Sequence, residues 1–406
     1  MVDTDFAWRL TQGLVRIDSS DPGAYEGEIE RYIKALVEER LAQLSHPVLD
    51  AVQIEELEVL PGRRNLMVTV PGRSDEPRLV YICHMDTVTL GDGWDADITP
   101  LGAVVRDGKL YGRGACDMKG GLACAITALV HALERVAAEG KLPRRGFSLI
   151  CSVDEEDFMR GSEAAINAGW VGSREWVLDT EPTDGQIQVA HKGRTWFEIE
   201  MAGVTAHASH PWKGADAVAA MAEAVCALRR AFMALPVHNE LGPSTITFGQ
   251  IEGGYRPYVV PDHAKVWVDM RLTPPTDTAA AKRMVEQAIA VAEAAVPGCH
   301  GSYAVTGDRP AIERNPASPL LAALKCAADD VTGADTTVGF FTGYTDTAVI
   351  AGKTGNRNCM SYGPGSLALA HKPNEYVPHA DIVRCQQVLI ALADNVLWDA
   401  SGQVGA

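Results

Sequence analysis

Residues 78–88 read RLVYICHMDTV, a short apolar run that ends abruptly in His84, Met85 and Asp86. Runs of this length that are rich in β-branched and aromatic residues and bounded by polar ones are typical of buried strands. In an extended chain residues i and i+2 point to the same side. We therefore expect the side chains of His84 and Asp86 to share one face at the carboxyl end of the strand.

Two interpretations of this strand end stay open from the stretch alone. Ligands of open α/β sheets bind beyond the carboxyl ends of strands, and a metal-binding imidazole usually donates its second N–H to a carboxylate. Under the first interpretation His84 binds a metal ion with Asp86 behind it. Under the second, the pair caps a helix that follows.

Two later apolar runs also end in acidic residues. The run at residues 147–153 is followed by Asp154, Glu155 and Glu156, and the run at residues 176–178 is followed by Asp179 and Glu181. Between the opening run, residues 78–83, and the run at 147–153, a glycine-rich stretch carries Asp117 and leads into a long apolar helix. Strands thus alternate with helices, which predicts a mainly parallel mixed sheet flanked by helices. Acidic residues at one strand end often mark only a solvated turn, but three such ends in one sheet indicate a shared site.

A different pattern begins near residue 190. Segments with strand and helix periods follow in the order β-α-β-β-α-β, the ferredoxin-like arrangement of a small antiparallel sheet with two helices. We therefore predict an α/β protein with two domains. Residues 1–189 and 307–406 form the domain with the mainly parallel sheet, and residues 190–306 form an inserted domain.

The composition limits the partners of the protein. The 406 residues carry a net charge of −17, which argues against nucleic acid and membrane partners, because both bind basic surfaces. We find no signal peptide and no apolar run of transmembrane length. The nine cysteines show no C-x-x-C spacing, as expected of reduced thiols. A cytoplasmic location is therefore expected.

Histidines and acidic residues at the strand ends and loops form a ligand set for two zinc-like divalent ions. The set comprises His84, Asp117, Glu155, Glu156, Glu181 and His371. Asp117 lies on a glycine-rich loop, which suits a carboxylate that bridges two ions. The adjacent Glu155 and Glu156 allow one carboxylate to bind metal while the other faces the substrate. Asp179 competes with Glu181 for the ligand role, because strand alternation places both on one face.

Six motifs of this chain resemble those of one family, in the same order and over nearly the whole chain. They read HMDTV (84–88), GRGACDMKGG (112–121), DEE (154–156), EPT (181–183), TAHAS (205–209) and HKPNE (371–375). The family is that of the zinc aminoacylases and exopeptidases, which includes acetylornithine deacetylases, succinyl-diaminopimelate desuccinylases and bacterial glutamate carboxypeptidases. The resemblance implies a zinc-peptidase-like catalytic domain whose insert, residues 190–306, is a lid and dimerisation domain.

The resemblance also implies a role for each matched residue. The metal ligands would be His84 and Glu181 for one ion, Glu156 and His371 for the other, and Asp117 as the bridge. Zinc is the expected metal, with cobalt or manganese as substitutes. Asp86 would orient His84, Glu155 would be the general base, His207 would stabilise the oxyanion, and Arg271 would hold the carboxylate of the substrate.

One segment departs from the family pattern. Relatives carry Asn in an Asn-x-x-Pro segment where this chain has Tyr258, and Arg256 lies nearby. We therefore count Tyr258 and Arg256 among the substrate-binding candidates. An aromatic or otherwise unusual acyl or amine part is expected in the substrate.

Together these residues predict a metal-dependent hydrolase that cleaves the amide bond of a small N-acyl amino acid or short peptide. A metal-bridging water would lose its proton to Glu155, which would return that proton to the leaving amine. Two alternatives are kept: hydrolysis of another C–N bond, in a carbamoyl amide or an aromatic amine, and a metal-binding scaffold without catalysis. The resemblance also implies a homodimer formed through the insert, whose edge strand could pair with its copy in a partner.

Overall fold

The computed structural model describes residues 3–398, which form two compact units. Unit 1 comprises the residues up to 189, residues 314–341 and the residues from 345 onward, and unit 2 comprises residues 190–313 and 342–344. Unit 2 begins where the sequence predicts the insert to begin. It ends at residue 313 rather than 306, because its last strand, β16 (His300–Arg309), extends beyond the predicted end of the insert.

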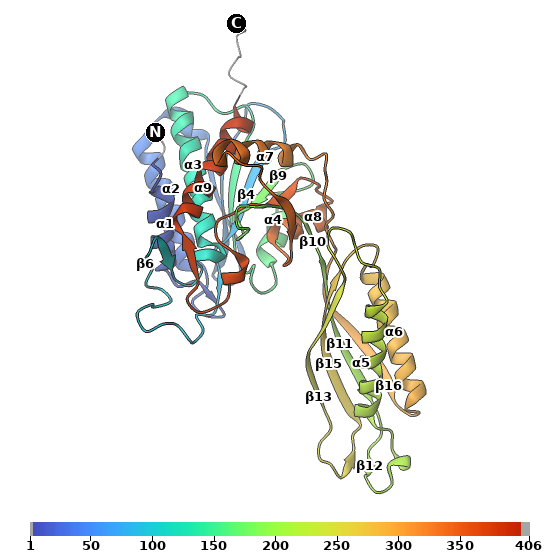
Figure 1. The fold of residues 1–406 in the computed structure, drawn as a ribbon. Helices are drawn as coiled ribbons and strands as arrows, with labels where there is room; N and C mark the ends of the chain where they lie inside the picture. Colours follow the sequence, from blue (N-terminus) through green and yellow to red (C-terminus); the bar gives the residue numbers. More distant parts are fainter. Residues whose placement is uncertain (1–2, 399–406) are drawn as a thin grey trace. The chain divides into compact units, whose positions relative to one another are not determined.

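A mixed sheet of eight strands forms the centre of unit 1 within the described residues (Figure 1). Its strands, in spatial order, are β17 (Val338–Phe341), β10 (Ile187–His191), β18 (Cys359–Ser361), β9 (Trp176–Asp179), β4 (Leu79–His84), β8 (Phe147–Ser152), β3 (Arg63–Val70) and β2 (Gln53–Leu60). The central strands β18, β9, β4 and β8 pair in parallel. Strand β3 pairs antiparallel with β2 and β8, and β10 pairs antiparallel with β18. The predicted α/β class with a parallel-centred mixed sheet is confirmed.

Strand β4 lies in the middle of this sheet, between β9 and β8, and all of its residues are buried. The hydroxyl of Tyr81 donates a hydrogen bond to the carbonyl of Leu389 at 2.8 Å, and its ring meets that of Phe147 edge-on at 5.0 Å. An aromatic pair of this kind contributes about 0.5–1.5 kcal/mol beyond the burial of its area. Because β4, β8 and β9 are parallel, their carboxyl ends lie at one edge of the sheet.

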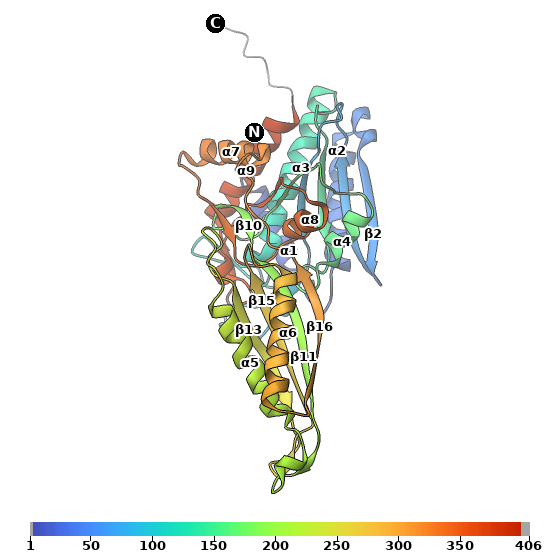
Figure 2. The same ribbon diagram turned by 90° about the vertical axis from the view of Figure 1, so that its right-hand side faces the viewer.

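Helices cover both faces of the sheet (Figures 1 and 2). One layer contains α1 (Phe6–Val15), α2 (Gly27–Leu44), α3 (Gly120–Glu139), α7 (Pro319–Thr332) and α9 (His379–Leu397). The other contains α4 (Arg160–Asn167) and α8 (Asp346–Thr354), which pack on each other. The short elements are β1 (Ser20–Asp21), β5 (Thr87–Val88), β6 (Val104–Arg106), β7 (Lys109–Tyr111), β19 (Tyr376–Pro378), η1 (Pro47–Ala51), η2 (Ala115–Lys119) and η4 (Leu367–Leu369).

The long helix α3 corrects one expectation. By length and composition, the segment Ala115–Glu139 is apolar enough to cross a membrane, contrary to the expectation that no run reaches that length. However, 72% of its most apolar part is buried inside the protein. Residues such as Leu122, Ile126 and Leu129 are fully buried, because α3 packs on α1, α2 and α9 as well as on the sheet. The apolar composition of α3 is therefore that of a core helix.

Unit 2 is an antiparallel sheet with helices α5 (Ala217–Met233) and α6 (Thr278–Ala295) on one face (Figure 2). Its strands lie in the order β13 (Thr245–Gly253), β15 (His263–Leu272), β11 (Gly193–Ala202) and β16. Alternate residues of β11 and β15 are buried, as expected of strands with one covered face. A ribbon of β12 (Ala206–His207) and β14 (Val259–Val260) follows, with the turn η3 (Pro211–Lys213). The predicted β-α-β-β-α-β order is present.

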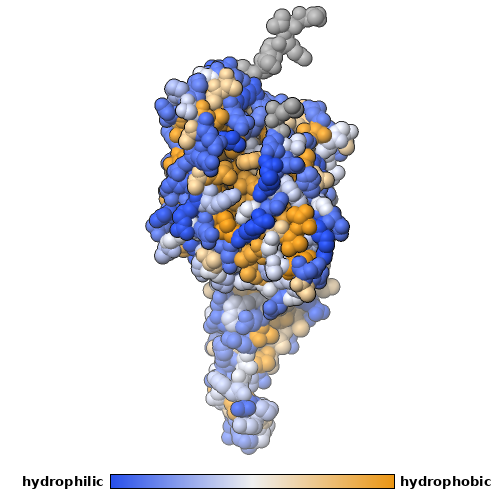
Figure 3. Space-filling model, turned by 90° about the vertical axis from the view of Figure 1, so that its left-hand side faces the viewer, coloured by the Kyte–Doolittle hydropathy of each residue, from blue (hydrophilic) through white to orange (hydrophobic). Residues whose placement is uncertain are grey.

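The surface and the cysteines agree with the composition. On the face shown in Figure 3, apolar side chains gather in the middle of unit 1 and hydrophilic side chains surround them. The hydrophilic part of this surface agrees with the 53 acidic and 36 basic residues of the chain. All nine cysteines fall within the described residues, and each is a free thiol.

Candidate metal centre

The predicted ligand residues gather at the edge of unit 1 where β4, β8 and β9 end. Their places are His84 at the end of β4, Glu155 and Glu156 after β8, Glu181 after β9, Asp117 in η2, and His371 between η4 and β19. Parallel strands that end at the same edge bring side chains from distant parts of the chain together. The structure therefore places all six residues in one cluster.

Asp117 lies between the two imidazoles. Its Oδ1 is 3.3 Å from Nε2 of His84, and its Oδ2 is 3.4 Å from Nε2 of His371. The peptide bond that follows Asp117 is cis. The two oxygens of one carboxylate thus face two ring nitrogens, and both atom types are ligands for zinc-like ions. This is the arrangement of a bridging carboxylate.

Each imidazole has further carboxylates of its own. Near His84, Oε1 of Glu181 lies 3.7 Å and Oε2 of Glu155 lies 4.0 Å from Nε2. Near His371, Oε2 of Glu156 lies 3.0 Å from Nε2. Glu181 and Glu155 thus lie near His84, and Glu156 lies near His371.

The charge balance of the cluster fits divalent cations. Four largely buried carboxylates face two imidazoles, and Oε1 of Glu156 is buried without a hydrogen-bond partner among residues 3–398. Burial raises the pKa of Glu181 well above its usual range, and the nearby carboxylates of Asp117 and Glu155 raise it further. Buried charges are costly unless they are paired or bind metal. Two dications would neutralise this surplus, so the residues fit the metal pair.

Hydrogen bonds to Asp117 and Glu156 raise the pKa of His371 to about 10. Without a metal ion, its imidazole therefore keeps a proton at neutral pH. Because a ligating histidine must be neutral, metal binding at this position releases that proton.

Asp86 contacts His84 in a different way from the one expected. Its backbone carbonyl accepts the hydrogen bond from Nδ1 of His84 at 2.9 Å, while its carboxylate Oδ1 lies 3.7 Å away. The Oδ2 atom accepts the backbone N–H of Glu156 at 3.0 Å. The strict alternation of side chains applies only inside a strand, and β4 ends at His84. Asp86 therefore orients His84 through its main chain and Glu156 through its side chain.

Of the two candidate ligands Asp179 and Glu181, only Glu181 lies in the cluster. Asp179 accepts a hydrogen bond from the hydroxyl of Thr347 at 2.7 Å. Glu181 instead joins the cluster with His84 and Glu155. Strand β9 ends at Asp179, so the two side chains do not share a face as strand alternation predicted.

A second acidic group in unit 1 surrounds a cation of the chain itself. Asp21, Glu26 and Asp86 lie close enough together to resemble a metal site. However, Arg63 contacts Glu26 by Nε at 2.7 Å and Nη2 at 2.5 Å, and Asp21 by Nη2 at 2.6 Å. Its Nη1 lies 3.4 Å from Asp154. The guanidinium thus pairs with Asp21, Glu26 and Asp154 and compensates part of the negative charge of this group.

Replacing Arg63 by Met is expected to lower the free energy of unfolding by about 3–5 kcal/mol, because removing one partner of a buried ion pair leaves uncompensated charge. The neighbouring Arg64 is half exposed and lies 3.8 Å from Glu56, so Arg64→Met is the matched control. A change of about 0–1 kcal/mol is expected there. Urea unfolding of the two variants measures both values, and equal losses would contradict the assignment of Arg63.

Three candidate residues lie together on the β12–β14 segment of unit 2. The carbonyl of Tyr258 accepts the N–H of Ala208 at 3.1 Å, next to His207. Tyr258 is 62% exposed, and Arg256 is exposed as well. Nδ1 of His207 accepts the N–H of Ser209 at 3.1 Å. The neutral ring therefore carries its proton on Nε2, where it can donate a hydrogen bond.

Arg271 lies elsewhere in unit 2, on β15, and shares no hydrogen bond with Tyr258 or Arg256 among the described residues. Its Nε and Nη2 donate to the two oxygens of Asp269 at 2.8 and 3.1 Å. Oδ2 of Asp269 also accepts Nε1–H of Trp196 at 2.7 Å. These side chains form one hydrogen-bonded group on the face of the sheet opposite α5 and α6.

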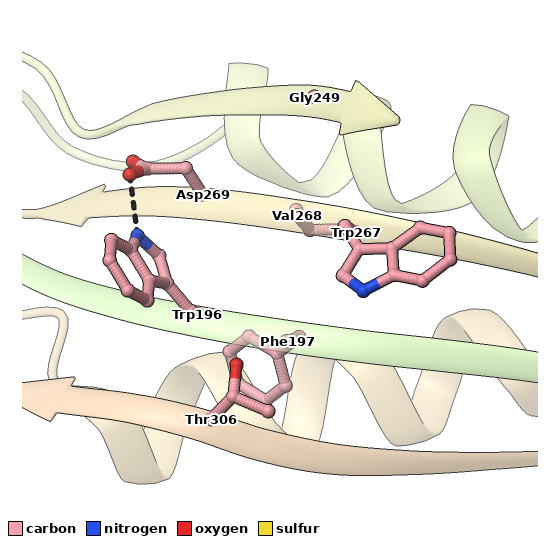
Figure 4. Close-up of a pocket in the computed structure, with 7 residues that line it drawn as sticks. All are labelled: Trp196, Phe197, Gly249, Trp267, Val268, Asp269 and Thr306. Atoms are coloured by element: carbon pink, nitrogen blue, oxygen red, sulfur yellow. Dashed lines mark hydrogen bonds between the residues drawn. The ribbon is translucent and has the colours of Figure 1, made fainter. Parts of the chain in front are cut away.

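The same face carries an open hollow of about 200 Å³ (Figure 4). It is lined by Trp196, Phe197, Gly249, Trp267, Val268, Asp269 and Thr306. Trp196 pairs with Asp269 and Trp267 with Glu198, so the two indoles are diagonal neighbours. Such neighbours are about 7–8 Å apart. The guanidinium of Arg194 lies over the ring of Trp196 at 4.2 Å and the ammonium of Lys265 lies over the ring of Trp267 at 4.7 Å.

Sequence reasoning assigned no role to Glu375, the last residue of the HKPNE motif. Its carboxylate is buried and accepts the backbone N–H groups of Cys116 and Asp117 at 2.9 and 3.1 Å. It also accepts Nη1–H of Arg113 at 2.8 Å. The one signal in the sequence was its place four residues after His371.

The imidazoles and carboxylates around Asp117 form a ligand set for zinc-like ions. A sequence profile described as peptidase family M20/M25/M40 matches residues 80–395 of the chain. The chain belongs to this family and is therefore a metallohydrolase of the peptidase and deacylase kind.

Individual proteins show the same relationship. The chain is 26% identical over 400 residues to a probable succinyl-diaminopimelate desuccinylase of Staphylococcus epidermidis, covering 91% of this chain and 92% of that protein. It is 29% identical over 333 residues to an acetylornithine deacetylase of Myxococcus xanthus, covering 80% and 82%. Its fold matches the crystal structure of the Bacillus subtilis YXEP protein, described as a dinuclear metal binding peptidase from the M20 family. The TM-score is 0.72 at 18% identity, with 97% and 99% of the chains covered. The predicted family and fold class are confirmed.

Proposed function

We propose that this protein uses two divalent metal ions to hydrolyse the amide bond of an N-acyl amino acid or a short peptide. The observation that carries the proposal is Asp117, whose two carboxylate oxygens face His84 and His371 at 3.3 and 3.4 Å. Paired metal ions serve many hydrolytic enzymes. The relatives named as a desuccinylase and a deacetylase support an acylated amino acid as the substrate.

The chain supplies separate ligands for each ion. His84 and Glu181 would hold one, His371 and Glu156 would hold the other, and Asp117 would contact both. When bound, zinc or a similar ion supplies a Lewis acid that polarises a carbonyl oxygen and lowers the pKa of water.

Glu155 is the residue best placed for proton transfer. Among the acids near His84 its oxygen is the most distant from Nε2, at 4.0 Å, compared with 3.3 Å for Asp117 and 3.7 Å for Glu181. Burial also raises its pKa well above the usual range of a glutamate. When it is ionised, the carboxylate of Glu155 can take a proton from the attacking water and give it to the leaving amine.

Two features of unit 2 support the choice of substrate. His207 presents Nε2–H, a donor of the kind that stabilises an oxyanion. The hollow between Trp196 and Trp267 suits an aromatic group, and Arg271 nearby offers a guanidinium for a carboxylate. We therefore favour an N-acyl amino acid with an aromatic side group.

A substrate panel tests the proposed reaction. The metal-loaded protein is assayed with N-acetyl, N-succinyl and N-carbamoyl amino acids, each with aliphatic and aromatic side groups, and with aromatic amines. Release of the free amino acid from N-acyl substrates is the expected result. Turnover of N-carbamoyl compounds or aromatic amines alone would replace the proposal by the other C–N bond reaction. No turnover by protein with two bound ions would contradict it.

Trp267→Ala is expected to lower kcat/KM for N-acetylphenylalanine by roughly 2- to 10-fold, because an aromatic pair contributes about 0.5–1.5 kcal/mol. The value of kcat/KM for N-acetylalanine should stay unchanged. Trp212 lies in unit 2, is 74% exposed and does not line the hollow, so Trp212→Ala is the control. Equal effects of Trp267→Ala on both substrates would contradict an aromatic subsite.

A further inference from the structure

Glu375 joins the two loops that carry Asp117 and His371. Its Oε1 accepts the N–H groups of Cys116 and Asp117, at 2.9 and 3.1 Å. It lies four residues after His371 on the same loop, and its own carbonyl accepts the N–H of Gly112 at 3.0 Å. One residue thus bonds to the start and to the centre of the glycine-rich loop.

Arg113 completes this connection. Its Nη1 donates to Oε2 of Glu375 at 2.8 Å, and both side chains are almost fully buried. Its remaining N–H groups donate to the carbonyls of Thr89, Leu90 and Lys372 at 3.1–3.3 Å. The guanidinium therefore compensates the buried charge of Glu375 and ties a third loop to the other two. Such charge-assisted hydrogen bonds are about twice as strong as neutral ones.

The backbone at Asp117 depends on this acceptor. Asp117 and Met118 have non-helical dihedral angles inside η2, so the N–H of Asp117 lies where a regular helical ladder is interrupted. The conformation at this residue decides whether its two carboxylate oxygens face His84 and His371. On the other loop, His371 and Asn374 have φ values of +64° and +59°, a conformation that costs energy in residues other than glycine.

We propose that Glu375 is a positioning residue that holds Asp117 between the two metal positions, with Arg113 as its charge partner. The inference rests on the proposed metal pair. Residues behind metal ligands orient them, and their loss typically lowers metal affinity by about 10- to 100-fold. Glu375 contacts neither metal position directly, so it acts through the main chain of Asp117.

Glu375→Gln tests this role, because glutamine keeps the shape and one oxygen but loses the charge. The matched control is Glu175→Gln, because Glu175 also accepts a backbone N–H, that of Gly172 at 2.9 Å, away from the cluster. Each metal-free protein is titrated with Co²⁺ against a competing chelator. The affinity of each equivalent, the cobalt absorption spectrum and the magnetic coupling between the two ions are recorded.

Glu375→Gln is expected to lower the affinity for at least one of the two Co²⁺ ions by about 10- to 100-fold. It should also reduce the magnetic coupling between the two ions, because the shared carboxylate is no longer fixed. Glu175→Gln should match the wild type. Arg113→Lys keeps a positive charge near Glu375 and should show a smaller change of the same kind. It also provides the test if Glu375→Gln does not fold. A Glu375→Gln protein with wild-type affinities and coupling would overturn the proposal, as would a lower Tm without any change in cobalt binding. A wild type that binds fewer than two ions would contradict the proposed function instead.

Discussion

Glu155→Gln is expected to lower kcat by about 10²–10⁴-fold, the usual contribution of a general acid–base group, while two metal ions stay bound. The amide of glutamine has nearly the shape of the carboxylate but cannot take a proton from water. Glu155 is not one of the proposed ligands, so both ligand sets should remain intact. Steady-state kinetics and metal analysis of the same preparation measure both quantities.

The control for this prediction lies on the helix that follows. Glu163 is in α4 and forms a surface ion pair with Lys353 at 3.6 Å, so Glu163→Gln should keep wild-type kcat and metal content. If Glu155→Gln kept most of the activity with both ions bound, the assignment of the base would be wrong. Loss of metal together with activity would instead make Glu155 a ligand.

Removal of metal by a chelator is expected to abolish activity and to lower Tm, and addition of Zn²⁺, Co²⁺ or Mn²⁺ should restore both. A ligand that binds only the folded state stabilises it by about 2.7 kcal/mol at 100 times its Kd. The carboxylates of the cluster repel one another without a cation, so metal binding should raise Tm by several degrees. Activity assays and thermal unfolding with and without metal provide the test.

Two results of that experiment would contradict the mechanism. Full activity in protein that metal analysis shows to be empty would exclude metal-assisted hydrolysis. Restored Tm without restored activity on any substrate of the panel would favour the non-catalytic scaffold. Adding Mg²⁺ in place of Zn²⁺ is a useful control, because Mg²⁺ prefers oxygen ligands and should bind weakly to the imidazoles of His84 and His371.

Strong local patterns explain which parts of the fold the sequence predicted. Strands β4 and β8 are fully buried apolar runs, and strands β11 and β15 of unit 2 alternate between buried and mostly half-buried residues. The elements that were missed are short. Strand β18 has three residues and α4 has eight, so each offers little length in which a pattern can be recognised. Their structure depends on tertiary contacts, because α4 packs on α8 and β18 inserts between β9 and β10.

The candidate site was predictable as far as residue types and motifs define it. His84, Asp117 and His371 occur in recognisable motifs, and the structure places them together. The contacts behind them were not predictable. Asp86 uses its carbonyl because the strand ends before it, and Glu375 bonds to Asp117 from 258 residues away. No local pattern encodes a contact of that sequence separation.

The order of strands in unit 1 has a consequence for synthesis of the protein. Strand β18 lies between β9 and β10 but follows unit 2 in the sequence. On the ribosome, β9 and β10 are therefore made before β18, the strand that separates them. All four strands of the sheet of unit 2 are made before β18 as well. His371 emerges later still. Translation thus completes the four-stranded sheet of unit 2 before it reaches His371, one of the proposed metal ligands.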